Sequence, residues 1–81
     1  MMIEVLYFAQ LREAFGVGQE RVELADGGTV ADVMAQLRAR DEWAAVAAIP
    51  LTFAVNERMV EDMHPLDSGD RLALLSPVSG G

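Results

Sequence analysis

The sequence predicts an α+β fold in which a mixed sheet of four to five strands is crossed on one face by a main helix. Segments near both ends are rich in β-branched, aromatic and aliphatic residues, a central segment carries apolar residues at helical spacing, and turn-forming residues separate them. With 81 residues, of which 52% are hydrophobic, the chain has the length of one domain and too much apolar content for a disordered polypeptide.

The first quarter of the chain predicts two strands joined through a short helix. Residues 3–8 combine β-branched and aromatic types, a composition typical of a strand. Residues 10–15 are expected to form a short helix that ends at the Gly-Val-Gly segment, 16–18. Residues 20–24 alternate charged and apolar side chains, which indicates a half-buried second strand.

The main helix is predicted to begin after the turn-forming residues 26–28. Thr29 is a suitable N-cap, and Asp32 follows three residues later, near the positive end of the helix. Four apolar residues then repeat at the i, i+3, i+4, i+7 spacing of one buried helical stripe: Val30, Val33, Met34 and Leu37.

The second half of the chain predicts a further short helix and three strands. Acidic residues at 41 and 42 suit the start of a helical segment, 42–49, which Pro50 should end. Strands are expected at 52–55, 59–60 and 71–75. We therefore expect a domain over residues 1–76, followed by a mobile tail over residues 77–81 that has little to pack against.

A hairpin, a helix and a returning strand in this order place the first and last strands side by side and parallel, which is the β-grasp arrangement. Glu4 and Arg71 should point away from the helix. The period of two then puts four apolar residues of these strands on the outer face: Leu6, Phe8, Ala73 and Leu75. An exposed apolar patch there would mark a contact surface; the alternative is that a loop or the second short helix covers it.

Charge and cysteine content exclude several classes of protein. Thirteen acidic residues against six basic ones give a net charge of −7 and a pI near 4.4, so we expect neither nucleic acid nor an anionic membrane as a partner. The absence of cysteine excludes a thiolate nucleophile and a zinc–thiolate site. The opening residues do not resemble a signal peptide and the longest apolar run, 43–51, is too short for a membrane span, so we expect a soluble, cytoplasmic protein.

Few residues suggest catalysis by the chain itself. His64 is the only histidine and has neither cysteine nor a second histidine to join it, so we expect a surface or capping role and no metal site. Ser68, Ser76 and Ser79 have no base at a recognisable spacing, which gives a hydrolase triad little support.

The terminal Gly80-Gly81 pair is the most suggestive feature of the sequence. It has no side chains and tolerates any backbone torsion. The residues after Ser76, fully extended, reach about 16 Å, enough to thread a narrow channel. The pair therefore suits a protein whose reactive group is its own terminal carboxylate; the alternative is a floppy chain end.

The two ends of the sequence resemble the small, sulfur-carrier subunit of molybdopterin synthase, the MoaD family. The opening segment that carries the resemblance is Val-Leu-Tyr-Phe-Ala-Gln-Leu-Arg-Glu, 5–13. The closing half resembles the family at Ala54-Val55-Asn56, His64-Pro65-Leu66, Gly69-Asp70 and Pro77-Val78-Ser79-Gly80-Gly81. The similarity runs over nearly the whole length, although residues 17–50 match only in pattern. It implies the ubiquitin-like form of the β-grasp fold.

The resemblance implies a carrier that holds no cofactor of its own. In that family a ubiquitin-activating-like adenylyltransferase uses ATP to adenylate the terminal glycine, which is then converted to a thiocarboxylate. The large subunit of molybdopterin synthase moves the sulfur onto cyclic pyranopterin monophosphate, and two transfers make the dithiolene. By motif, Gly81 is the sulfur-bearing residue and Gly80 the slender one behind it. Catalytic residues are expected on the large subunit.

The resemblance also implies partner contacts at four positions. Phe8 and Arg12 match family positions that contact the partners, and Met59 and Leu75 match two further apolar contact positions. The residue types at the positions of Met59 and Leu75 vary between family members.

Three other functions fit parts of the sequence. Thiamine-pathway sulfur carriers share the fold and the Gly-Gly end, but are usually shorter and lack both the helical segment 42–49 and the Phe-Ala-Gln-x-Arg-Glu opening. A ubiquitin-like modifier would form an amide with a lysine of a target protein. The third alternative, a plain interaction domain, leaves the Gly-Gly end without a role.

Overall fold

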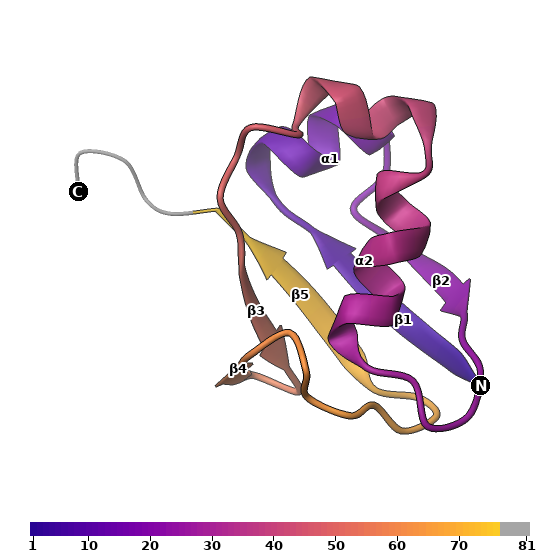
Figure 1. The fold of residues 1–81 in the computed structure, drawn as a ribbon. Coiled ribbons are helices and arrows are strands. Elements are labelled where there is room, and N and C mark those ends of the chain that lie inside the picture. The colour runs from indigo at the N-terminus through magenta and orange to yellow at the C-terminus, as the bar shows by residue number, and fades with distance from the viewer. Residues whose placement is uncertain (77–81) are drawn as a thin grey trace.

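Five strands form one mixed sheet in the order β2-β1-β5-β3-β4 (Figure 1). The computed structural model describes residues 1–76, so the predicted tail, 77–81, with Gly80 and Gly81, lies outside the described residues. The strands are β1 (Met2–Tyr7), β2 (Gln19–Glu23), β3 (Thr52–Val55), β4 (Arg58–Val60) and β5 (Arg71–Leu75). Since β1 pairs antiparallel with β2 and parallel with β5, the predicted β-grasp arrangement is confirmed.

Helix α2 (Val30–Arg38) crosses one face of the sheet, and α1 (Ala9–Phe15) and the 3-10 helix η1 (Asp41–Ala45) lie together at one end of it (Figure 1). The Thr29 amide donates to the Asp32 carboxylate at 2.9 Å, which forms half of a capping box at the start of α2. All four residues of the predicted stripe are at most 1% exposed, so the stripe is confirmed as the buried face of α2.

The predicted helix over 42–49 is shorter than expected and has a tighter winding. After η1 the chain continues in turns, in which the Val46 amide donates to the Trp43 carbonyl and the Ile49 amide to the Val46 carbonyl, each at 3.0 Å. A repeat of three residues puts these three side chains on one side of the segment. All three pack against the core.

A group of aromatic side chains joins the helices to the sheet. Tyr7 stacks on Phe15 with ring centroids 4.5 Å apart, and the Arg40 guanidinium lies 4.7 Å from the centroid of Phe15 on the ring face. Burial raises the pKa of the Tyr7 hydroxyl, which therefore stays neutral and donates to the Glu20 carboxylate. Glu20 also pairs with Arg40, so the Tyr7 hydroxyl and the Glu20 carboxylate both have polar partners.

The helices of residues 1–76 have five to nine residues each. Within residues 1–76, none has both the length and the hydrophobicity that a transmembrane segment requires.

Two glycines give a matched test of the packing. A Cβ atom at Gly28 would lie 2.6 Å from the buried Leu24 side chain and 3.0 Å from the Ala25 carbonyl oxygen, whereas one at Gly18 would meet nothing closer than 3.5 Å. Gly28→Ala should therefore lower the free energy of unfolding by about 1–3 kcal/mol, and Gly18→Ala should change it by less than about 0.5 kcal/mol. Urea unfolding followed by Trp43 fluorescence measures both; equal midpoints for the two variants would contradict the packing at Gly28.

Candidate functional site

The face of the sheet opposite α2 carries a row of apolar side chains that runs across four strands. The strand register pairs Leu6 with Ala73, Ala73 with Ala54, and Ala54 with Met59. Because directly paired residues point to the same face of a sheet, these side chains form one continuous row from β1 to the edge strand β4.

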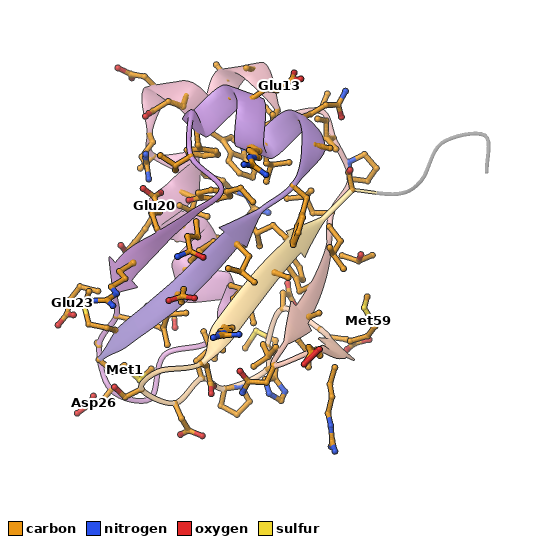
Figure 2. All side chains as sticks on the ribbon, turned by 180° about the vertical axis from the view of Figure 1, so that it is seen from behind. Met1, Glu13, Glu20, Glu23, Asp26 and Met59 are labelled. Carbon is orange, nitrogen blue, oxygen red and sulfur yellow. The ribbon has the colours of Figure 1, made fainter. Side chains whose placement is uncertain are left out.

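An open groove of about 480 Å³ lies over the centre of this row. Phe8 and Leu75 line it together with the row residues Leu6, Ala54 and Ala73. The predicted strand phase is therefore confirmed: Phe8 is 47% exposed, although it directly follows a fully buried position of β1. Figure 2 views this face of the sheet, and no helix or loop of residues 1–76 lies across it, so the alternative of a covered patch is wrong for this part of the chain.

Polar side chains line the groove near the β3–β4 turn. They belong to Asn56, Glu57 and Arg71. The side-chain amide of Asn56 donates to Asp70 at 3.0 Å, and its oxygen accepts from the Arg71 backbone amide at 3.0 Å. These bonds fix the β3–β4 turn to the start of β5, so the polar lining has a defined position relative to the apolar part.

Backbone strain concentrates around the same groove. Within residues 1–76, the non-glycine residues with positive φ are Ala9 (48°), Asn56 (50°) and Glu57 (72°). Ala9 directly follows Phe8, and the other two line the groove and form the two-residue turn between β3 and β4. A two-residue hairpin turn of type I′ requires positive φ at both of its central residues, so the conformations of Asn56 and Glu57 follow from the tight β3–β4 turn at the polar end of the groove.

The four predicted contact residues do not all lie together. Phe8 and Leu75 line the groove, and Met59, which is 63% exposed, continues the apolar row beyond it. Arg12 is exposed on α1, does not line the groove, and has its guanidinium beside Gly18 before β2. Phe8, Leu75 and Met59 thus form one apolar surface, with Arg12 outside it.

Sequence reasoning missed three groove residues: Ala54, Asn56 and Glu57. An Asn followed by a charged residue between two short strands is a turn signal that could have placed the last two at a hairpin tip. Ala54 had no such signal, because its neighbours in β3 give no alternation of polar and apolar types.

No metal-binding cluster accompanies the groove. Among residues 1–76, no three His, Asp or Glu side chains come together as possible ligands, and His64 is exposed. An exposed apolar surface of this kind is typical of sites that recognise another apolar surface.

Comparison with protein families matches residues 5–81 to the model of the ThiS family. A curated protein of Chlamydomonas reinhardtii, called molybdopterin synthase sulfur carrier subunit, is 39% identical over the whole of both chains. A protein of the same name from Escherichia coli K12 is 43% identical over 99% of this chain and 100% of its own.

Solved structures support the same fold. SAMP1 from Haloferax volcanii has a TM-score of 0.83 with 26% identity over the whole of both chains. A chain from the Helicobacter pylori complex of subunits 1 and 2 of molybdopterin-converting factor has a TM-score of 0.74, also with 26% identity and full coverage of both. A ubiquitin of Caldiarchaeum subterraneum, at 19% identity and a TM-score of 0.60 over 100% of this chain and 98% of its own, confirms the ubiquitin-like fold alone.

Two substitutions to aspartate test the assignment of the sheet faces. Phe8→Asp places a charge on the open face and should change the free energy of unfolding by less than about 1 kcal/mol. Leu74, which is fully buried on the face toward α2, is the control: Leu74→Asp buries an unpaired carboxylate and should cost more than about 4 kcal/mol. Thermal unfolding by circular dichroism measures both. A large loss of stability in Phe8→Asp would show that Phe8 belongs to the core.

Proposed function

The chain belongs to the ThiS family, and from this we propose that it is a sulfur carrier of molybdenum cofactor biosynthesis that bears its sulfur on the carboxylate of Gly81. The observation that carries the proposal is the similarity to two molybdopterin synthase sulfur carrier subunits over essentially the whole of each chain. The open apolar groove supports it, since a carrier has to dock on the enzymes that load and unload it.

The composition of the chain limits where sulfur can be carried. With no cysteine, the chain has no thiol, so the terminal carboxylate is the group we assign. Sulfide does not displace oxide from a free carboxylate, because oxide is too poor a leaving group. Attack of the carboxylate on the α-phosphorus of ATP releases pyrophosphate and gives an acyl-adenylate, from which a sulfur nucleophile displaces AMP. We assign ATP binding and the acid–base groups to an activating adenylyltransferase.

If the chain docks through the groove, the length of chain after β5 limits how far the Gly81 carboxylate can reach into the partner. Strand β5 ends at Leu75, whose side chain lines the groove, and Gly81 follows six residues later. The residues after Ser76 span at most about 16 Å when extended. We therefore propose that Phe8, Met59 and Leu75 contact the large subunit of molybdopterin synthase, so that Gly81 enters its active site and donates sulfur to cyclic pyranopterin monophosphate. The Helicobacter complex of subunits 1 and 2 supports such a partner.

Two rival functions use the same fold. The likeness to SAMP1, a small archaeal modifier protein, favours a ubiquitin-like modifier whose carboxylate forms an amide with a target lysine. The presence of η1, in the region where thiamine-pathway carriers lack a helical segment, disfavours a role in thiazole formation. The product formed at Gly81 separates these functions: a thiocarboxylate consumed in molybdopterin synthesis, a thiocarboxylate consumed in thiazole synthesis, or an amide.

Activation of Gly81 can be followed directly by intact mass. Incubation with the activating enzyme, ATP and a sulfur donor should exchange one oxygen of the terminal carboxylate for sulfur. One residue added after Gly81 should stop transfer, because the reacting carbon must come within about 3–3.5 Å of its attacker. Gly80→Ala should slow transfer, since the added methyl group widens the tail. Both variants should unfold at the wild-type temperature, because neither changes residues 1–76.

Two results would contradict the carrier function. An extended chain that supports molybdopterin synthesis without being trimmed would show that the carboxylate is not the working group. Amides to lysines of other proteins, formed without any thiocarboxylate, would favour the modifier instead.

The acidic surface predicts salt-dependent association with the large subunit. The net charge is −7, and a subunit that holds an anionic pterin phosphate is expected to present positive charge near its active site. The association rate constant should fall as salt rises, because charges are screened over about 10 Å at 0.1 M salt, while the dissociation rate constant should change little. Stopped-flow mixing at increasing sodium chloride tests this, and an association rate that does not depend on salt would rule out steering.

A further inference from the structure

Methionine supplies all the side-chain sulfur of this chain, since it has five methionines and no cysteine. Their accessibility differs widely: Met34 in the core is 1% exposed, whereas Met59 is 63% and Met63 70% exposed. Oxidation of a thioether requires access to the sulfur, so peroxide should reach Met59 and Met63 well before Met34.

The two most exposed methionines lie on different parts of the fold. Met59 pairs with Ala54 at the end of the apolar row, next to the groove (Figure 2). The residues that flank Met63 are tied to the start of α2: the Asp62 carbonyl accepts from the Ala31 amide at 2.7 Å, and the His64 carbonyl from the Val30 amide at 3.1 Å. Neither methionine lines the groove itself, but Met59 extends the apolar row through its pairing with Ala54, whereas Met63 lies after the end of β4 and belongs to no strand of the sheet.

We propose that Met59 is a reversible oxidation site that controls docking through the outer face of the sheet. The inference rests on the proposed function for the identity of the docking partner, whereas the oxidation itself concerns only this chain. Met59 is 63% exposed in the folded chain, so a small oxidant such as peroxide can approach its side chain without unfolding.

The oxidation is balanced with a peroxide as the oxidant. The thioether sulfur attacks one oxygen of hydrogen peroxide, the O–O bond breaks, an S–O bond forms and water leaves, so that sulfur loses two electrons and peroxide gains them. A methionine sulfoxide reductase with a thiol reductant reverses the change: the sulfoxide oxygen leaves as water, and two thiols become a disulfide.

The sulfoxide should affect binding without affecting folding. In the free chain the sulfoxide oxygen stays hydrated, because the side chain is exposed. In the docked state the same oxygen is pressed against an apolar surface without a hydrogen-bond partner, which is costly. Docking should therefore weaken roughly tenfold to a hundredfold, while the unfolding temperature stays unchanged.

The test compares three chains: the wild type, Met59→Leu and the matched control Met63→Leu. Each is treated with hydrogen peroxide, its oxidised methionines are located by peptide mass mapping, and its Kd for the large subunit is measured by calorimetry. Treated wild type and treated Met63→Leu should bind roughly tenfold to a hundredfold more weakly than before treatment, and the reductase should restore both. Met59→Leu should keep its affinity throughout, because leucine keeps the contact apolar and cannot be oxidised.

Three outcomes would overturn the inference. The first is that Met59 stays reduced under conditions that oxidise Met63. The second is a failure of the comparison between the chains: either wild type with oxidised Met59 binds as tightly as before treatment, or treated Met59→Leu loses as much affinity as the treated wild type does. Either of these results overturns this inference and leaves the proposed function intact. The third is that untreated wild type fails to bind the large subunit, which overturns the docking step of the proposed function and this inference with it.

Discussion

The parallel pairing of β1 with β5 is the interaction on which the rest of the structure depends. It joins segments from opposite ends of the chain in a fixed register, Glu4 with Arg71 through Tyr7 with Leu74. Parallel neighbours need a crossover connection, and α2 lies within the one that this chain uses. A slip by one residue would send the buried side chains of one strand to the open face, so this register defines both the core and the groove.

The face of the sheet toward α2 provides most of the stability, whereas the opposite face is open for recognition. The inward residues of β1 and β5 are at most 1% exposed and pack against the equally buried stripe of α2. The outward residues of these two strands are half-buried or exposed and contribute less to stability. Substitutions on the open face should therefore cost little in folding stability compared with substitutions on the face toward α2.

Much of this arrangement could be predicted from the sequence, because the alternation of side chains along a strand shows which residues share a face of the sheet. Glu4 and Arg71 mark the exposed phase of β1 and β5, and that phase puts Phe8 and Leu75 on the groove. Strand β3 contains Thr-Phe-Ala-Val without a charged residue, so its phase, and with it the place of Ala54, could not be assigned. The alanine-rich segment after Asp41 favours an α-helix by propensity, but the chain forms a 3-10 helix followed by turns, with Trp43, Val46 and Ile49 packed against the core.

The shape of the groove follows from side-chain volume. Ala73 and Ala54 occupy its centre on neighbouring strands, while the larger Phe8, Leu6 and Leu75 surround them. Small residues between large ones leave a hollow, so a partner that fills it has to present a protruding apolar side chain. At the polar end, Arg71 is 69% exposed and only loosely paired with Glu4 at 3.6 Å, a contact that contributes little to stability. This guanidinium therefore stays accessible to solvent at the polar end of the groove, beside the apolar hollow.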